Sequence, residues 1–486
     1  MMSNKKAGIF SSFLWRLFEL IGSQGVSFIV SIILARKLSP TDYGTVAIVS
    51  VIISIVDVFA TKGFGAALIQ KKDADDVDFS TVFFFNIVFS VILYMLMFVG
   101  APFIAVFYDN QEISMLIRVL SIRVLFSGVN SVQQAYIARR MEFKKFFFAT
   151  FGGTLLSAVV GIAMAYRGFG AWALVLQYLT NVVVDTIVLW IMSGWRPIRA
   201  FSYRKLKNLF QYGWKILCAA LLGTIYNNVQ SVIIGKRYSS ADLAYYSKGK
   251  QLPQTIISNV STAMEGVMFP AMANAQVDPL EIKQIARKSI SMSAFIIFPL
   301  ALGLFATAES VIIFLFTEKW CDAIPLLKCA CFIYILWPIQ TVALQVIKAR
   351  GRSDLFLRLE IYKKVIGLSG VVVGMYWGVW GIVIAETMAS IVSAIVDVVF
   401  AGKLISYSWK EQIEDIRISL AGACIMAIVV MAVGNILRAS LLITLLIQVL
   451  CGIITYFVWS LLFSNPCVQV FLNAVSSLRG VKKKNS

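Results

Sequence analysis

The sequence predicts an all-α protein that crosses a membrane about fourteen times, and three observations lead to this fold class. Of its 486 residues, 59% are hydrophobic and 14% are charged, with a mean hydropathy of +0.81, whereas a soluble domain carries about 25% charged residues. Apolar runs of about 20 residues, each long enough to cross ~30 Å of hydrocarbon, recur along the whole chain. The connections between these runs are too short to hold a folded soluble domain.

The predicted spans follow one another with short polar connections. In two places, 289–316 and 360–401, neighbouring runs nearly merge, and the region around Glu309 is either a helix extension or an interfacial segment. In chain order the spans are residues 13–34, 43–64, 81–107, 114–136, 147–166, 171–192, 211–234, 252–274, 289–316, 323–347, 360–378, 379–401, 418–437 and 441–463.

The positions of the basic residues predict the orientation of the chain. The net charge is +19, from 44 Lys and Arg against 25 Asp and Glu, and one set of alternating connections holds roughly three times as many Lys and Arg as the other. This bias places both termini in the cytoplasm and indicates topology rather than a nucleic-acid partner. The seven cysteines lie mostly within spans and predict neither a disulfide framework nor a metal site.

The chain also repeats itself. Arg36–Asp42, after the first span, aligns with Lys236–Asp242, after the seventh, at an offset of 200 residues. This predicts a duplicated six-helix bundle with an N-terminal lobe in 1–200 and a C-terminal lobe in 201–402, and the last two spans with a basic tail in 403–486. The alternative is that basic loop residues recur simply because the topology requires them.

Several spans carry polar side chains along one helical face, which is costly in hydrocarbon unless that face lines a cavity or meets a partner. The first span places Ser12, Arg16, Glu19, Ser23 and Ser27 on one face. Guanidinium and ammonium groups in a cavity would attract an anion, and guanidinium geometry suits pyrophosphate. The candidate substrate-binding cations are Arg16, Arg118, Arg123 and Lys215.

Carboxylates within the spans are the candidates for ion coupling. The chain has no histidine, so proton coupling would need buried carboxylates with raised pKa values, and sodium coordination is equally open. The alternative is that these groups neutralise the cations as structural pairs between helices. The candidate coupling groups or charge partners are Glu19, Asp57, Asp185, Glu265 and Glu386.

Several segments together resemble a known family. The stretch Ala35–Gly44 (ARKLSPTDYG) resembles the first loop of polysaccharide flippases in the MOP exporter superfamily. A later matching segment, Tyr245–Pro253, departs from the family pattern because Lys248 and Lys250 stand where an Arg is often found. The likeness covers roughly residues 8–400 and is greatest to the branch of O-antigen and colanic-acid-type (Wzx-like) exporters. The other matching segments are Tyr245–Pro253, Val267–Met272, Phe298–Gly303, Lys319–Leu327 and Ala349–Arg352.

The resemblance implies a fourteen-helix transporter with two six-helix lobes around a central cavity. Its implied activity is transfer of undecaprenyl-pyrophosphate-linked oligosaccharides across the bacterial inner membrane by alternating access, coupled to protons or sodium. Besides this substrate and the membrane lipids, we expect a polysaccharide polymerase and chain-length machinery as partners, and no cofactor.

Two rival functions remain open. One is a multidrug or small-molecule antiporter of the same superfamily, which usually has twelve spans. The other is an enzyme, a membrane glycosyltransferase or polymerase, for which Asp73-x-Asp75 would supply the metal-binding D-x-D pattern. We expect a solvated acidic loop at these aspartates and no enzymatic activity.

Overall fold

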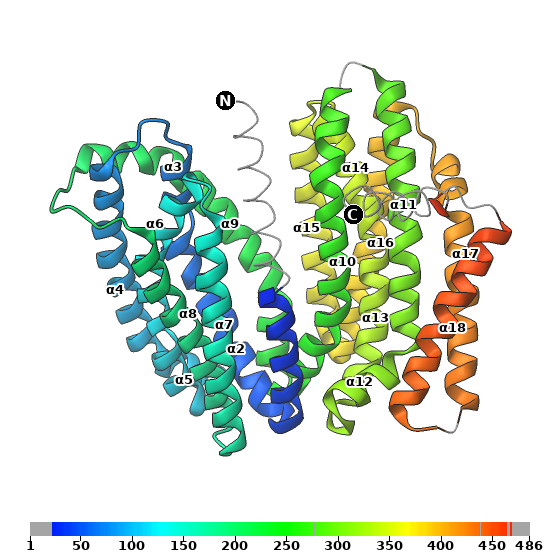
Figure 1. Ribbon diagram of the computed structural model, residues 1–486, viewed down its shortest axis with the longest axis horizontal. Helices are drawn as coiled ribbons and strands as arrows, with labels where there is room; N and C mark the ends of the chain where they lie inside the picture. Colours follow the sequence, from blue (N-terminus) through cyan, green and yellow to red (C-terminus); the bar gives the residue numbers. More distant parts are fainter. Residues whose placement is uncertain (1–21, 276–277, 438, 464–466, 469–486) are drawn as a thin grey trace, which may run out of the picture. The chain divides into compact units, whose positions relative to one another are not determined.

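The computed structural model describes residues 22–275, 278–437, 439–463 and 467–468, and all regular secondary structure in these ranges is helical (Figure 1). The predicted all-α fold class is confirmed. The chain divides into two compact units, the first ending at Ala244 and the second beginning at Tyr245. Arg16 and Glu19, with the start of the first predicted span, lie outside the described residues.

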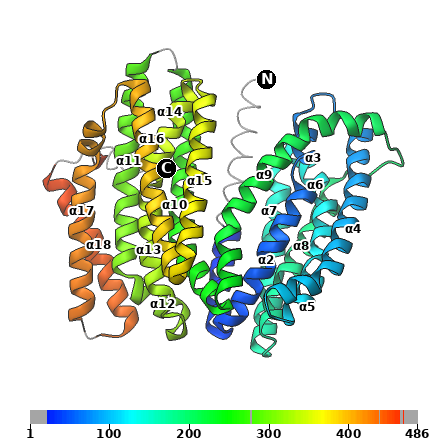
Figure 2. The ribbon, with the colours of Figure 1, turned by 180° about the vertical axis from the view of Figure 1, so that it is seen from behind.

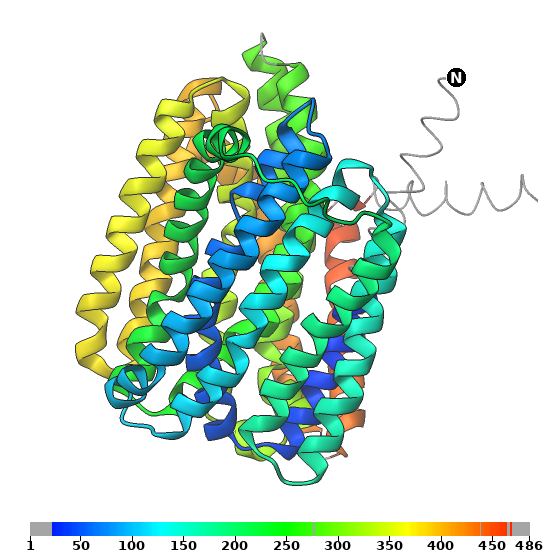
Figure 3. The same ribbon diagram turned by 90° about the vertical axis from the view of Figure 1, so that its left-hand side faces the viewer.

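The helices of the first unit follow in chain order after a helical segment at 22–37. They are α2 (Pro40–Thr61), α3 (Phe64–Gln70), α4 (Asp76–Phe107), α5 (Glu112–Leu120), α6 (Ile122–Arg139), α7 (Phe143–Tyr166), α8 (Ala171–Ser193) and α9 (Tyr203–Arg237). Figure 3 shows α7 and α8 side by side as a helical hairpin. Figure 2 shows α9 beside α2, the helix against which it packs.

The second unit contains most of α10, which begins just before the boundary between the units. Its helices are α10 (Ser240–Asn274), α11 (Pro279–Ala306), α12 (Ala308–Phe316), α13 (Ala323–Ile335), α14 (Trp337–Ala349), α15 (Ser353–Gly374), α16 (Gly378–Ile405), α17 (Trp409–Ile436) and α18 (Leu441–Leu462). Two short 3₁₀ turns, Glu318–Trp320 and Met375–Trp377, join neighbouring helices. The last two helices, α17 and α18, lie side by side in Figure 1.

The helices reproduce the fourteen predicted spans in order. Within the described residues, ten helical stretches are long and apolar enough to cross a membrane, one of which, Ser353–Ile405, contains both α15 and α16. The remaining spans are the helix at 22–37, the pair α5 and α6, and α10, whose polar side chains lower their hydropathy. The chain is therefore an all-α multi-pass membrane protein.

Four of the predicted spans are interrupted. Gly63, with φ of 95°, separates α2 from α3, a conformation that favours glycine. Ser121 separates α5 from α6, and Thr307 separates α11 from α12, so that the region around Glu309 forms a short separate helix. Pro338 enters the first turn of α14 and cannot donate a backbone hydrogen bond, which ends α13 at Ile335.

The aligned loops at the starts of α2 and α10 have the same local structure. The Ser39 hydroxyl accepts from the Asp42 backbone N–H at 3.1 Å, and the Ser39 N–H donates to the Asp42 carboxylate at 3.0 Å. The corresponding distances at Ser239 and Asp242 are 3.1 and 3.1 Å. Reciprocal bonds of this kind cap the first helical turn. Their recurrence at an offset of 200 residues supports the predicted duplication.

The boundary between the two compact units differs from the predicted boundary between lobes. The sequence analysis places residues 201–237 in the C-terminal lobe, whereas α9 packs here against α2 and α3 of the first unit. The two compact units are defined by which helices pack together, whereas the predicted lobes are defined by the sequence repeat. The two boundaries can differ, because a helix of one repeat can pack against helices of the other. The assignment of lobes 1–200 and 201–402 stays a prediction.

Candidate functional site

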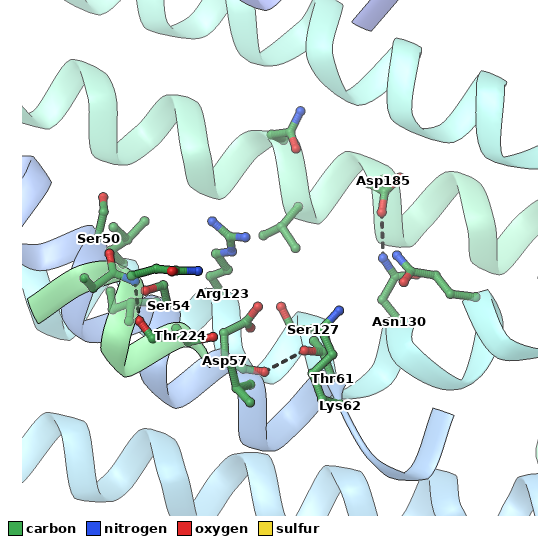
Figure 4. A pocket seen from close by; sticks show the side chains of 18 residues that line it. Ser50, Ser54, Asp57, Thr61, Lys62, Arg123, Ser127, Asn130, Asp185 and Thr224 are labelled. Carbon is green, nitrogen blue, oxygen red and sulfur yellow. Dashed lines mark hydrogen bonds between the residues drawn. The ribbon is translucent and has the colours of Figure 1, made fainter. Parts of the chain in front are cut away.

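A cavity of about 570 Å³ lies within the first unit, between α2, α6, α8 and α9 (Figure 4). Its lining is mainly polar, which is unusual inside a bundle of membrane helices, because unpaired polar groups are costly there. The polar lining residues are Ser50, Ser54, Asp57, Thr61, Lys62, Arg123, Ser127, Asn130, Gln134, Asn181, Asp185, Thr224, Asn227 and Asn228.

Helix α2 contributes the carboxylate of Asp57. The neighbouring hydroxyls bond to their own helix, with Thr61 Oγ1 donating to the Asp57 carbonyl at 2.8 Å and Ser54 Oγ donating to the Val51 carbonyl at 2.7 Å. Asp57 is half-buried, and its Oδ1 atom is buried without a hydrogen-bond partner in the described part of the chain. This oxygen is therefore available to a proton or a cation.

Helix α6 contributes the guanidinium of Arg123, which Figure 4 shows projecting into the cavity. The side chain is half-buried, and Nε is buried with no hydrogen-bond partner among the described residues. Of the ion pairs that the described residues form, none involves Arg123. A half-buried guanidinium without an ion-pair partner among the described residues is a ready donor to an anion.

Helix α8 contributes Asp185, which joins α6 through a strong hydrogen bond. Asn130 Nδ2 donates to Asp185 Oδ2 at 2.6 Å, drawn as a dashed line in Figure 4. Asn130 is 3% exposed, and its own Oδ1 has no partner among the described residues. Asn181, one helical turn before Asp185, adds a second amide to the lining.

The structure thus brings together three of the predicted site residues, Asp57, Arg123 and Asp185. Two other candidate cations are outside the lining. Arg118 Nε donates to the Phe98 carbonyl at 3.2 Å, and its guanidinium lies 4.6 Å from the Phe98 ring, which ties α5 to α4. Lys215 is exposed on α9 and does not line the cavity.

The remaining two carboxylates belong to the second unit. Glu386 on α16 forms an ion pair with Lys250 of α10, and it accepts a hydrogen bond from Tyr246 Oη at 3.0 Å. Lys250 Nζ also donates to Tyr246 Oη at 3.0 Å. Glu386 therefore forms a structural ion pair between two helices, which is the alternative to ion coupling given in the sequence analysis. Glu265 is half-buried on α10.

Sequence reasoning missed a second buried ion pair in this unit. Lys363 Nζ on α15 lies 3.0 Å from Asp397 Oδ2 on α16 and 2.6 Å from Glu360 Oε1. The Lys363 side chain is 11% exposed and that of Asp397 is fully buried. Lys363 lies near the start of the predicted span at 360–378, whereas α15 begins at Ser353, so that Lys363 is well inside the helix. The sequence did contain one indication of this pairing, because Glu360 and Lys363 are three residues apart and therefore lie on the same face of a helix.

The position in the second unit that corresponds to Asp57 is apolar. At the offset of 200 residues, Ile257 of α10 corresponds to Asp57 of α2. Ile257 is 1% exposed and packs in an apolar core with Phe298 and Tyr334. An apolar side chain thus occupies the place where the first unit holds its carboxylate.

Asp75, the second aspartate of the D-x-D pattern, has a structural role. The Asp75 carboxylate caps α4 by accepting from the Asp78 N–H at 2.9 Å. It also accepts from Lys205 Nζ at 2.5 Å, and this bond lowers the pKa of Asp75 to about 2. Among the described residues, no group of three or more His, Cys, Asp or Glu could hold a metal ion.

The long apolar helices define a multi-pass membrane protein, and its first unit encloses a polar cavity. The chain belongs to the polysaccharide biosynthesis protein family, which it matches over residues 33–325.

Three curated relatives come from bacteria. The teichuronic acid biosynthesis protein TuaB of Bacillus subtilis (strain 168) is 28% identical over 299 residues, which are 60% of this chain and 61%, less than two thirds, of TuaB. The succinoglycan biosynthesis transport protein ExoT of Rhizobium meliloti (strain 1021) is 24% identical over 81% of this chain and 78% of its own length. The lipopolysaccharide biosynthesis protein WzxC of Escherichia coli (strain K12) is 20% identical over 88% of each chain.

Two solved structures show the same fold. The lipid II flippase MurJ in an inward closed conformation has a TM-score of 0.78 and 13% identity, over 94% of this chain and 100% of that chain. An inward-facing multidrug resistance MATE transporter of the MOP superfamily has a TM-score of 0.62 and 18% identity, over 81% of this chain and 98% of that chain. At these identities the likeness shows a shared fold and no more.

Proposed function

We propose that this protein flips undecaprenyl-pyrophosphate-linked oligosaccharides from the cytoplasmic to the outer leaflet of a bacterial inner membrane, with both termini in the cytoplasm. Transport proceeds by alternating access of the two lobes and is coupled to protons or sodium. The observation that carries this proposal is the polar cavity of the first unit, in which Arg123 lacks an ion-pair partner among the described residues.

The family favours a substrate of polysaccharide biosynthesis, whereas the fold does not distinguish a lipid-linked substrate from a soluble one. The relatives ExoT and WzxC are named for succinoglycan transport and lipopolysaccharide biosynthesis, and MurJ is named as a lipid II flippase. The fold is shared with multidrug transporters as well. The choice between the two substrate classes therefore depends on the cavity, where a guanidinium favours a phosphate-bearing anion over a drug cation.

The charges of the lining suggest how an ion gradient drives transport. Arg123 and Lys62 supply two positive charges, and Asp57 and Asp185 supply two negative charges, so the cavity is formally neutral. An inward proton or Na⁺ gradient drives export only if the ion and the substrate occupy the cavity in turn, so Asp57 or Asp185 would release its ion to the cytoplasm before pyrophosphate binds at Arg123. Ion and substrate then weaken each other's binding, and by linkage each does so to the same degree.

The proposal is tested by flipping assays in proteoliposomes with undecaprenyl pyrophosphate carrying an oligosaccharide, under imposed proton or sodium gradients. Arg123→Gln is expected to lower the flipping rate about tenfold to a hundredfold, because a hydrogen bond to a charged group contributes ~1.5–3 kcal/mol. Arg123→Lys keeps the charge and should retain part of the rate. Arg118→Gln, outside the cavity, is the matched control and should flip at nearly the wild-type rate.

The coupling scheme has its own test in the same vesicles. Asp57→Asn and Asp185→Asn should make flipping insensitive to the gradient, since each removes a site for the ion. Arg123→Gln flipping at the wild-type rate would overturn the assignment of the substrate cavity. Gradient-dependent flipping by both Asn variants would overturn the assignment of the coupling carboxylates.

A further inference from the structure

Helix α10 carries a polar face that the cavity of the first unit does not include. On this face, side chains recur every three or four residues, which places them along one line of the helix. The face consists of Gln251, Gln254, Thr255, Ser258, Asn259 and Thr262, called here the α10 stripe. All but the half-buried Ser258 are exposed.

The opposite face of α10 is apolar and buried in the second unit. Leu252 and Ile257 are 7% and 1% exposed, and Met268 and Met272 are 5% and 0% exposed. Ser261, on this side of the helix, is also buried, at 4% exposed. Helix α10 is therefore amphipathic in the manner of a helix that separates a protein core from water.

The stripe lies at membrane depth. Helix α10 has 35 residues, so it is about 52 Å long at ~1.5 Å per residue, against ~30 Å of hydrocarbon. Residues 251–262 occupy the middle of this length and extend for about 16 Å. Exposed amides and hydroxyls at that depth would be costly against lipid tails, because these cannot form hydrogen bonds. A polar face at that depth therefore requires water or a polar ligand beside it.

The chemistry of the stripe is neutral. Amide and hydroxyl side chains each donate and accept hydrogen bonds. Of the nearest basic groups on the same helix, Lys250 pairs with Glu386, and the buried Lys248 donates from Nζ to Oε1 of Gln251, at the end of the stripe, at 3.3 Å. The nearest acid along the face is Glu265, beyond Thr262. Such a surface suits a neutral polyhydroxyl ligand and is unsuited to pyrophosphate.

We propose that the α10 stripe binds the sugar moieties of the substrate and determines which oligosaccharides are transported. This rests on the proposed function, because it assigns the sugars of the same lipid-linked substrate to a surface separate from the Arg123 cavity. The stripe contributes specificity for the sugar part, whereas Arg123 contributes affinity for the pyrophosphate that all such lipids share.

The test compares two probes in proteoliposomes. The first is the lipid-linked oligosaccharide extracted from the strain that produces the polysaccharide, and the second is undecaprenyl pyrophosphate carrying one sugar. The variant Gln254→Met/Thr255→Val/Thr262→Val keeps side-chain size and removes the hydrogen-bonding groups. We expect it to flip the oligosaccharide about tenfold more slowly, equivalent to about 1.4 kcal/mol, and the single-sugar lipid at the wild-type rate. Val267→Ala, exposed on the apolar side of α10, is the matched control.

The outcomes separate the two proposals. If the triple variant slows both probes equally, or neither, the stripe does not recognise sugars. If it instead changes the oligomeric state and leaves both rates intact, the stripe is an interface between copies of this chain, and the proposal is likewise overturned. If Arg123→Gln flips both probes normally while the triple variant loses only the oligosaccharide, the pyrophosphate site fails and the sugar site stands.

Discussion

The buried ion pair between α15 and α16 predicts an unequal response to removal of its two members. Asp397 is fully buried, its Oδ2 lies 3.0 Å from Lys363 Nζ, and its Oδ1 has no hydrogen-bond partner among the described residues. Lys363→Met therefore leaves a buried carboxylate without compensation. Asp397→Asn leaves Lys363 with Glu360, 2.6 Å away, as its partner.

The size of each effect follows from this geometry. Removing one partner of a buried pair costs about 3–5 kcal/mol, and Lys363→Met should approach that range. Asp397→Asn should cost about 1 kcal/mol, because it loses one hydrogen bond and buries no uncompensated charge. For a unit of this size, 1 kcal/mol shifts Tm by roughly 2–4 °C. We expect Tm to fall by roughly 10 °C for Lys363→Met and roughly 3 °C for Asp397→Asn.

The assay is thermal unfolding of the purified full-length protein in detergent, followed by gel filtration of the heated samples. The double variant Lys363→Met/Asp397→Asn should recover most of the stability that Lys363→Met loses, because the uncompensated charge is gone. The reasoning is refuted if Asp397→Asn is the more damaging single change, or if the double variant is no more stable than Lys363→Met.

Replacing Glu386 by Gln should lower Tm, because it leaves the largely buried Lys250 ammonium without its carboxylate; an unchanged Tm would contradict the pairing. Gly44→Ala should reduce the yield of folded protein in gel filtration, since its Cβ would lie 1.6 Å from the backbone oxygen of Ser240, the first residue of α10, whereas Gly100→Ala, with nothing within 4 Å, should not. The depressed pKa of Asp75, about 2, means that its ion pair contributes stability above its ordinary pKa of about 3.9 and loses it as pH falls through about 2. The Tm difference between Asp75→Asn and wild type should therefore be constant from pH 8 to about pH 5 and shrink in high salt.

The spans were predictable because each is specified by its own residues. Hydropathy and length located every described helix that crosses the membrane, and Ser39 and Asp42 mark a helix start directly in the sequence. Helix ends were less accurate where a helix continues beyond the hydrocarbon. Helix α9 begins at Tyr203, eight residues before the predicted span, because hydropathy reports only the apolar part.

The partners of the charged residues were much less predictable. Polar stripes correctly placed Asp57, Arg123 and Asp185 on faces that meet in one cavity. The pairing of Glu386 with Lys250 depends on how α16 packs against α10, two helices far apart in the chain, and no local pattern encodes that register. Helical periodicity defines the face of a helix but not its neighbour.

The two ion pairs of the second unit differ in when they can form during synthesis. Lys363 and Asp397 are 34 residues apart on consecutive helices, so they can enter the membrane together as a neutralised hairpin. Lys250 and Glu386 are 136 residues apart, so Lys250 must wait for its partner. At ~5–20 residues per second, that delay is roughly ten seconds. During this delay α10 carries the unpaired ammonium of Lys250 as well as its polar stripe. Both are costly in lipid, so α10 is expected to stay beside the insertion machinery until α16 has been made.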